Sequence, residues 1–241
     1  MEATLLPVPH ISQLGLGADH FRNDCGAACA AMLIKAYTGK DVTPNQLFAA
    51  ISPVDRYLRV DELKSALDQH GLQTTWQADN HLIGLFGILM DGRPVIALIS
   101  YAPLVDAGLG ASSFRGSHFV VVVGMDIRHV YILDPLRTDH TPLAVPIATW
   151  MCTWTEVAAQ GNPACGWLAP TAQLEGAFAV EMAHARVTCD VLNVRSGPGV
   201  GHPSIGVLRE GDVIQVLEKR GEWIRHGENR WSYGQYLSEL Q

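Results

Sequence analysis

The spacing of apolar positions in the first part of the chain is that of α-helices. Residues 24–37 (DCGAACAAMLIKAY) are mostly small or apolar, as in a helix packed into a core. Asp24 is placed to cap the start of this helix, and Gly39, after Thr38, is placed to end it. The pattern therefore predicts a buried helix whose first turn contains Cys25.

Two shorter helices are predicted to follow. Thr43, Pro44 and Gln46 are typical of a capping box with proline at the first helical position, so a second helix should begin there and reach about Ile51. A third should run over residues 60–71. The positions that share one of its faces are Leu63, Ala66, Leu67 and His70.

The pattern then changes to short apolar runs bounded by turns. Residues 72–78 are typical of a strand, residues 82–90 of a short helix, and residues 95–100 (VIALIS) of a buried strand. Two further strands are predicted over residues 119–124 and 130–134. We expect these two to pair as antiparallel neighbours.

In two segments, the apolar residues do not recur at the spacing of a helix or a strand. Residues 101–117 are rich in Gly, Ser and Ala, so we expect a mobile segment there. Residues 135–175 mix Pro, Thr, Trp and Cys, and the only element predicted in them is a short helix near residues 154–159. Together, the helices and strands indicate a first domain of the α+β class over residues 1–175.

The composition changes after Glu175. Residues 176–185 (GAFAVEMAHA) carry no strong helical or strand signal, and their length suits a linker. Over residues 186–241, short β runs alternate with turns, as in a small all-β barrel. We therefore predict two domains joined by this linker.

Composition and charge exclude several classes of partner. Charged residues make up 17% of the chain and the formal net charge is −7, which disfavours nucleic acid. The longest apolar runs, such as residues 95–99, are far shorter than the roughly 20 residues that a membrane-spanning helix needs. Residues 1–10 lack the basic head and apolar stretch of a secretory signal, so we expect a cytoplasmic protein until it is released.

The five cysteines are an odd number, so at least one thiol is free or pairs with another molecule. They are Cys25, Cys29, Cys152, Cys165 and Cys189. A bridge between Cys152 and Cys165 is one possibility that the spacing leaves open. The cysteines and histidines show no paired spacing of zinc ligands, so no metal or other cofactor is implied.

Cys25 combines several features of a nucleophile. A helix N-terminus supplies unpaired N–H groups and partial positive charge, which stabilise a thiolate. The peptide N–H of Cys25 is placed to donate to a developing oxyanion, and Gly26 leaves room for a substrate backbone. The alternative is a small residue in a tightly packed helix, which is the role we expect for Cys29, one turn deeper in the helix.

A nucleophilic thiol needs a base, and histidine has the suitable pKa. Among the ten histidines, His118 stands at the start of a rigid apolar strand. If the two strands pair as expected, Asp134 can reach the His118 ring; otherwise it is a turn residue before Pro135. Gln13 is a candidate second oxyanion donor, although a single glutamine is usually just solvated.

These residues lie in four stretches: VPHISQ with Gln13, NDCGAACAAML with Cys25, GSHFVVVVG with His118 and VYILDPL with Asp134. In this order they resemble the papain-like cysteine peptidases of the bacteriocin-processing (double-glycine) type. The resemblance implies a papain-like fold and amide hydrolysis. It also implies the roles of nucleophile for Cys25, general base for His118, orienting acid for Asp134 and oxyanion donor for Gln13.

Residues 186–241 resemble the bacterial SH3-like domain through LNVRSGPG, LREGDVIQVL, GEWIRH and RWSYGQYL. Such domains often hold peptidoglycan-cutting enzymes on the wall, which raises the effective substrate concentration. The alternative is a generic β-barrel spacer. The candidate ligand-stacking residues are Trp223, Trp231, Tyr233 and Tyr236, and we expect some of them to be core residues.

The leading hypothesis is a cysteine peptidase that hydrolyses amide bonds in bacterial wall peptides, such as a phage-type endolysin acting at the cell wall. The barrel would then be its wall-binding module. One alternative is a general or processing protease whose barrel binds a protein partner, and another is a non-catalytic binding protein on the same fold. Acyl transfer to an amine uses the same residues, so the sequence does not separate a transferase from a hydrolase.

Overall fold

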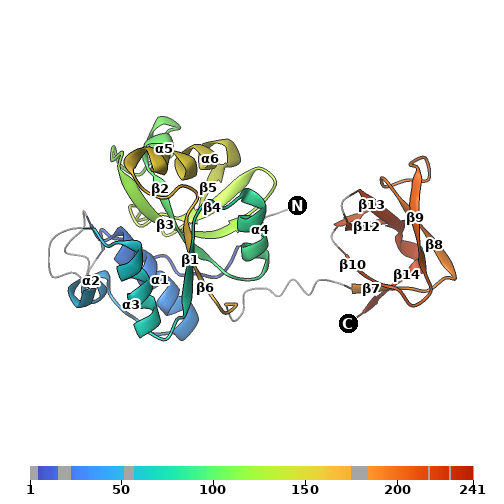
Figure 1. Ribbon diagram of the computed structural model, residues 1–241, viewed down its shortest axis with the longest axis horizontal. Coiled ribbons are helices and arrows are strands. Elements are labelled where there is room, and N and C mark those ends of the chain that lie inside the picture. Colours follow the sequence, from blue (N-terminus) through green and yellow to red (C-terminus); the bar gives the residue numbers. More distant parts are fainter. Residues whose placement is uncertain are drawn as a thin grey trace. The chain divides into compact units, whose positions relative to one another are not determined.

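The computed structural model describes residues 5–15, 23–51, 57–174, 184–216, 218–227 and 229–240. The chain forms two compact units, residues 1–178 and 179–241 (Figure 1). The first is a mixed α+β unit and the second contains strands and a 3₁₀ turn, which agrees with the predicted fold class. Most of the predicted linker, residues 176–183, lies outside the described residues, and the first strand of the second unit begins at His184.

A six-stranded antiparallel sheet forms the centre of the first unit, in the order β1-β6-β2-β3-β4-β5. Its strands are β1 (Thr74–Gln77), β2 (Val95–Ser100), β3 (Ser117–Met125), β4 (His129–Leu133), β5 (Leu143–Pro146) and β6 (Trp167–Pro170). Every residue of β2 is buried, because helices cover both faces of the sheet at its centre. The β-branched run predicted for this strand therefore lies in the core.

Helices pack against this sheet. They are α1 (Cys25–Thr38), α2 (Pro44–Ile51), α3 (Val60–Gln69), α4 (Leu82–Met90), α5 (Ala102–Asp106) and α6 (Ile147–Glu156), which continues into the 3₁₀ turn η1 (Val157–Gln160). Figure 1 shows α1, α2 and α3 grouped on one side, and α5 and α6 on the other. Helix α1 packs on β3 and helix α6 on β2, so the central strands are covered by both groups.

The predicted ends of the first helices are confirmed, with one exception. Gly39 adopts a left-handed conformation (φ 69°) and its N–H donates to Lys35 O, which ends α1. The capping box of α2 is present, since the Thr43 N–H donates to Gln46 Oε1 and the Gln46 N–H to Thr43 Oγ1. Asp24 precedes α1, but its side chain makes no capping hydrogen bond, so the predicted cap is wrong.

The predictions for the segments without a period need correction. Residues 101–117 were expected to be mobile, yet the segment begins with α5, and Tyr101 and Leu104 are buried. The helix expected near residues 154–159 begins earlier, as α6, which buries Trp150 and Trp154. Strands β5 and β6 were not predicted, because each has only four residues and lies in the stretch of mixed Pro, Thr, Trp and Cys, which obscures the alternation of a strand.

The second unit consists of two antiparallel sheets, β10-β7-β14 and β11-β12-β13-β8-β9. Its small core contains Ala185, Ile214 and Ile224. The elements are β7 (His184–Val187), β8 (Val191–Arg195), β9 (Ser204–Arg209), β10 (Val213–Gln215), β11 (Glu218–Arg220), β12 (Trp223–Gly227), β13 (Arg230–Tyr233), the 3₁₀ turn η2 (Gly234–Tyr236) and β14 (Leu237–Leu240).

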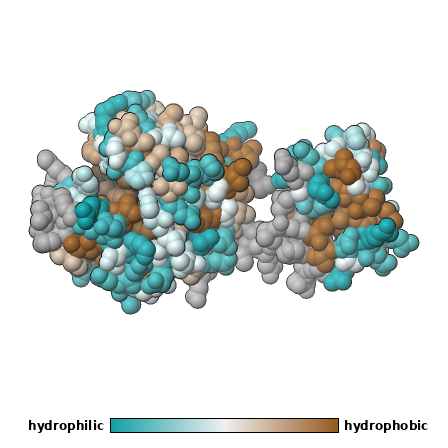
Figure 2. Space-filling view, in the orientation of Figure 1, coloured by the Kyte–Doolittle hydropathy of each residue, from teal (hydrophilic) through white to brown (hydrophobic). Residues whose placement is uncertain are grey.

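Apolar side chains gather on the visible surface of each unit (Figure 2). On α4, Ile83, Phe86 and Met90 are exposed at helical spacing, while Leu85 and Leu89 are buried. On the second unit, the exposed apolar residues include Val191, Val200, Ile205, Val207 and Val213. Within the described ranges, no helix combines the length and the apolar character needed to span a membrane.

Candidate active site

Helix α1 places Cys25 at its first residue, at the junction between the helix and β3. The Cys25 side chain is 7% exposed, so it is almost covered but lies at the edge of the core. Gly26 allows the start of α1 to pack closely on β3, because a Cβ at that position would lie 3.3 Å from the Phe119 ring. The thiol therefore sits where the N-terminal N–H groups of the helix can stabilise a thiolate.

The antiparallel pairing of β3 with β4, which the sequence predicted, brings His118 and Asp134 together. His118 is the second residue of β3, and Asp134 follows the last residue of β4. His118 Nε2 lies 2.8 Å from Asp134 Oδ1, and both side chains are buried. The carboxylate can therefore fix the orientation of the imidazole and stabilise its protonated form.

Cys25 and His118 are also joined by a hydrogen bond. Burial acts to raise the pKa of the Cys25 thiol, but His118 and the N–H groups of Gly26 and Phe119 outweigh it and leave the pKa below its ordinary value. Burial acts to lower the pKa of His118, but Asp134 and Cys25 outweigh it and raise the pKa to about 9.

These opposite shifts favour a charged pair, with a thiolate on Cys25 and an imidazolium on His118. Burial acts to raise the pKa of Asp134, but the hydrogen bond and charge of His118 keep it below its ordinary value. Cys25, His118 and Asp134 thus form a continuous chain that is able to serve as nucleophile, proton carrier and orienting carboxylate.

The Asp134 carboxylate has two further donors. The Leu136 N–H donates to Oδ1 over 2.9 Å, and the Tyr101 hydroxyl donates to Oδ2 over 2.6 Å. Sequence reasoning missed Tyr101, because it lies in the segment expected to be mobile. Its position directly after the buried strand VIALIS was the one available signal.

Gln13 lies beside the segment that follows Asp134. It is buried, and its backbone N–H donates to Pro135 O over 2.9 Å. Ser12 supports the same carbonyl, since its hydroxyl donates to Pro135 O over 3.0 Å. The chain around Gln13 is therefore fixed to the end of the strand that carries the catalytic carboxylate candidate.

The other cysteines differ from Cys25. Cys29 is completely buried, and desolvation holds the pKa of its thiol well above the ordinary value. The bridge considered between Cys152 and Cys165 is not formed: both thiols are free, with Cys152 exposed and Cys165 buried. Across the described ranges, no group of three or more His, Cys, Asp or Glu side chains is arranged to hold a metal ion.

The four aromatic candidates of the second unit divide into two groups. Tyr233 has its ring centroid 5.5 Å from that of Trp223 and 6.0 Å from that of Tyr236, so these three form one cluster. Trp223 and Tyr233 are partly exposed and Tyr236 is 44% exposed. Trp231 is buried, and the guanidinium carbon of Arg220 lies 5.3 Å from its ring centroid, so Trp231 is not open for stacking.

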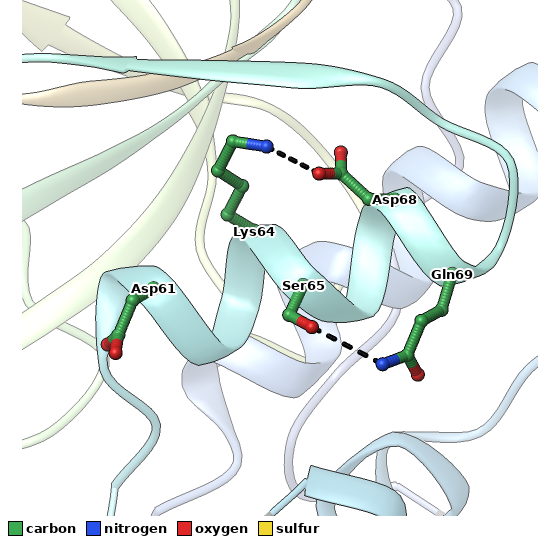
Figure 3. Close-up of a pocket in the computed structure, with 5 residues that line it drawn as sticks. All are labelled: Asp61, Lys64, Ser65, Asp68 and Gln69. Carbon is green, nitrogen blue, oxygen red and sulfur yellow. Dashed lines mark hydrogen bonds and ion pairs between the residues drawn. The ribbon is translucent and has the colours of Figure 1, made fainter.

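An open hollow of about 420 Å³ lies elsewhere, along the exposed side of α3 (Figure 3). Its lining residues are Asp61, Lys64, Ser65, Asp68 and Gln69. Lys64 pairs with Asp68 and the Gln69 amide donates to Ser65, each one turn apart, as on an ordinary solvated helix face. None of the catalytic candidates lines this hollow.

Two family models match the chain, each over one unit. The model described as the Peptidase C39-like family matches residues 5–161, and the model described as the bacterial SH3 domain matches residues 190–238. No curated protein matches the chain in sequence.

Three solved structures are similar to part of this chain, and the first of them has a TM-score that indicates a shared fold. A C39-like peptidase from Bacillus anthracis is 19% identical with a TM-score of 0.52, covering 72% of this chain and 100% of that one. The peptidase domain of Streptococcus ComA, described as a bifunctional ABC transporter, is 15% identical with a TM-score of 0.46, covering 68% and 98%. A double-glycine-motif protease of an AMS/PCAT transporter is 19% identical with a TM-score of 0.39, covering 69% and 94%.

Proposed function

Because this chain belongs to the Peptidase C39-like family of papain-like cysteine peptidases and carries a bacterial SH3 domain, we propose that it hydrolyses amide bonds in peptides of the bacterial cell wall. The hydrogen-bonded chain from Cys25 through His118 to Asp134 is the observation that supports the chemistry. The SH3 domain supports the choice of substrate.

In the proposed reaction, the Cys25 thiolate attacks the carbonyl carbon of the scissile amide and forms a C–S bond. The His118 imidazolium gives its proton to the nitrogen of the leaving amine as the C–N bond breaks, which leaves a thioester on Cys25. Water then attacks the thioester and gives a proton to His118, and the acid product leaves as the thiolate returns. Asp134 stays ionised throughout and stabilises the imidazolium.

The tetrahedral intermediates carry a negative oxygen that needs donors. We assign the N–H of Cys25, at the start of α1, and the side-chain amide of Gln13 to this role. The Gln13 backbone is held next to Pro135, and this supports the assignment because it limits where the side-chain amide can lie.

The second unit supports the proposed substrate class. The cluster of Trp223, Tyr233 and Tyr236 offers partly exposed aromatic faces of the kind that stack on a ligand. A domain held on the wall raises the local concentration of wall peptides around the peptidase unit. We therefore propose that the protein acts at the cell wall, as an endolysin does, with the SH3 domain as its anchor.

Substrate choice is tested by comparing purified bacterial cell walls with a denatured protein, and measuring the release of amino groups from each. We expect the wild type to release amino groups from walls, and the Trp223→Ala/Tyr236→Ala variant to do so more slowly. Release from the denatured protein alone would overturn the wall proposal and identify a general protease. If the double variant binds to walls as well as the wild type does, the aromatic cluster is not the wall-binding site.

A further inference from the structure

Tyr101 links three parts of the first unit through its side chain. It follows β2 directly, and its side chain is 0% exposed. The hydroxyl donates to Asp134 Oδ2 over 2.6 Å and accepts the N–H of Ala111 over 2.8 Å. One phenol oxygen therefore joins the carboxylate to the chain of residues 107–116.

The Tyr101 ring also contacts the imidazole. The ring centroids of Tyr101 and His118 are 4.9 Å apart and the rings meet edge to face at 77°. Phe114 completes this group, with its centroid 6.1 Å from Tyr101 and 6.3 Å from His118. Tyr101 thus restrains His118 directly through its ring, and indirectly through the carboxylate.

The Tyr101 hydroxyl does more than fill space in the core, because it is a hydrogen-bond donor to Asp134. Asp134 Oδ1 already accepts the His118 ring and the Leu136 N–H, so Tyr101 supplies the donor to the other oxygen. A carboxylate held at both oxygens cannot rotate about its terminal bond without breaking a hydrogen bond. Fixing both oxygens keeps Oδ1 directed at His118.

We propose that Tyr101 is a positioning residue, which holds Asp134 toward His118 and ties residues 107–116 to this acid–base pair. The proposal rests on the proposed roles of Cys25, His118 and Asp134. The titratable groups that influence the pair are Cys25 from α1, Tyr101 itself, Cys29, Arg137 and His10, whose Nε2 lies 2.8 Å from Asp134 O.

Tyr101→Phe removes the hydroxyl and keeps the ring against His118. With the carboxylate less well oriented, the imidazolium loses stabilisation and the thiolate loses its well-placed partner. The pH range in which the charged pair exists should then narrow from both sides: Cys25 ionises at higher pH, and His118 loses its proton at lower pH. We expect kcat to fall about tenfold to a hundredfold, the range for a hydrogen bond to a charged group, with KM little changed.

The same hairpin offers a matched control. Tyr131 donates its hydroxyl to Asp126 Oδ2 over 2.8 Å, but Asp126 lies in the turn between β3 and β4, at the end away from His118 and Asp134. Tyr131→Phe therefore removes the same kind of bond, from tyrosine to carboxylate, without touching the site. A second test variant is Ala111→Pro, which removes the N–H that holds the Tyr101 hydroxyl from the other side.

The experiment follows the rate of Cys25 alkylation by iodoacetamide against pH, together with kcat and KM, in the full chain. Thermal unfolding of each variant identifies temperatures at which it is folded. The proposal requires that in Tyr101→Phe the acid limb of the alkylation profile moves to higher pH, the alkaline limb of kcat/KM moves to lower pH and kcat falls. It also requires a smaller change of the same sign in Ala111→Pro and wild-type behaviour in Tyr131→Phe. If Tyr101→Phe does not fold, the Ala111→Pro result decides.

The positioning role would be overturned if kcat fell equally in Tyr101→Phe and Tyr131→Phe. It would also be overturned by a wild-type alkylation profile in Tyr101→Phe. Alkylation needs no substrate, so this result is independent of the substrate assignment. An unreactive Cys25 in the wild type would instead reject the proposed function itself, and the positioning role with it.

Discussion

Asp134 Oδ1 and His118 Nε2 are 2.8 Å apart, in a place where neither side chain is open to water. A buried carboxylate is stable only when its oxygens are paired, and here His118, Tyr101 and the Leu136 N–H pair them. The imidazole in turn needs the carboxylate, because burial alone would favour its neutral form. The structure therefore couples the charge state of His118 to Asp134, and through His118 to Cys25.

Removing the thiol tests the nucleophile. Cys25→Ser keeps the size of the side chain, but a hydroxyl is far less acidic than a thiol and does not form the charged pair. We expect hydrolysis to fall at least about a thousandfold with the fold retained. Amino-group release with a soluble peptide measures the loss, and near-ultraviolet circular dichroism checks the fold. Wild-type turnover would exclude Cys25 as the nucleophile.

Cys29 provides the matched control for that change, because it lies on the same helix and its pKa is raised by burial. Cys29→Ala should leave the rate of hydrolysis unchanged at temperatures where the variant is folded. Iodoacetamide at neutral pH should label Cys25 and not Cys29, as mass spectrometry of tryptic peptides will report. Preferential labelling of Cys29 would contradict the assignment of the reactive thiol.

The activity should depend on pH through the charged pair. The pKa of His118 is raised to about 9, so its imidazolium is present at neutral pH and is lost as the pH rises through that value. The pKa of Cys25 is lowered, so the thiolate persists to lower pH than it would on an ordinary thiol and is lost as the pH falls through that lowered pKa. We expect a bell-shaped profile of kcat/KM with an alkaline limb near pH 9. A limb near the ordinary histidine value of 6.5 would contradict the raised pKa.

Two replacements of Asp134 should distinguish the effect of its negative charge from the effect of its hydrogen-bond acceptor. Asp134→Asn retains an oxygen that accepts from His118 but removes the negative charge, so the alkaline limb should move to lower pH. Asp134→Ala removes the buried acceptor of both the His118 ring and the Tyr101 hydroxyl, and we expect it to lower the free energy of unfolding by about 3–5 kcal/mol. Urea unfolding compares the two variants. Equal effects of Asn and Ala on the pH profile and on stability would show that the hydrogen-bond acceptor has no role.

In the second unit, replacing the aromatic residues should affect wall binding at some positions and stability at another. Trp223→Ala and Tyr236→Ala should weaken binding to cell walls and leave hydrolysis of a soluble peptide unchanged, because their rings are on the surface. Trp231→Ala should instead destabilise the unit by about 3–5 kcal/mol, because its side chain is buried. Cosedimentation with walls and thermal unfolding distinguish the two effects. Loss of wall binding from a fully folded Trp231→Ala variant would contradict this division.

The sequence was most informative where a local pattern determines structure. The helical spacing after Asp24, the capping box at Thr43 and the β-branched strands are local signals, and the elements formed as predicted. The proximity of His118 and Asp134 followed from them, because pairing two adjacent strands brings their far ends together.

The features that were missed depend on contacts between distant residues. The five residues of α5 are too few to give a recognisable period, and burial of Leu104 by the rest of the unit forms part of its packing. The role of Tyr101 depends on Asp134, which is 33 positions away, and no local pattern marks such a pair. Trp231 and Tyr233 are both aromatic residues of β13, and only the structure separates the buried ring from the partly exposed one.

The most direct test of the central claim is the initial rate at which amino groups are released from purified bacterial cell walls by the wild type and by Cys25→Ala. We predict steady release by the wild type and none above background by the variant, with both proteins bound to the walls to the same extent. Release at the same rate by both would contradict the claim that Cys25 is the nucleophile of a wall peptidase.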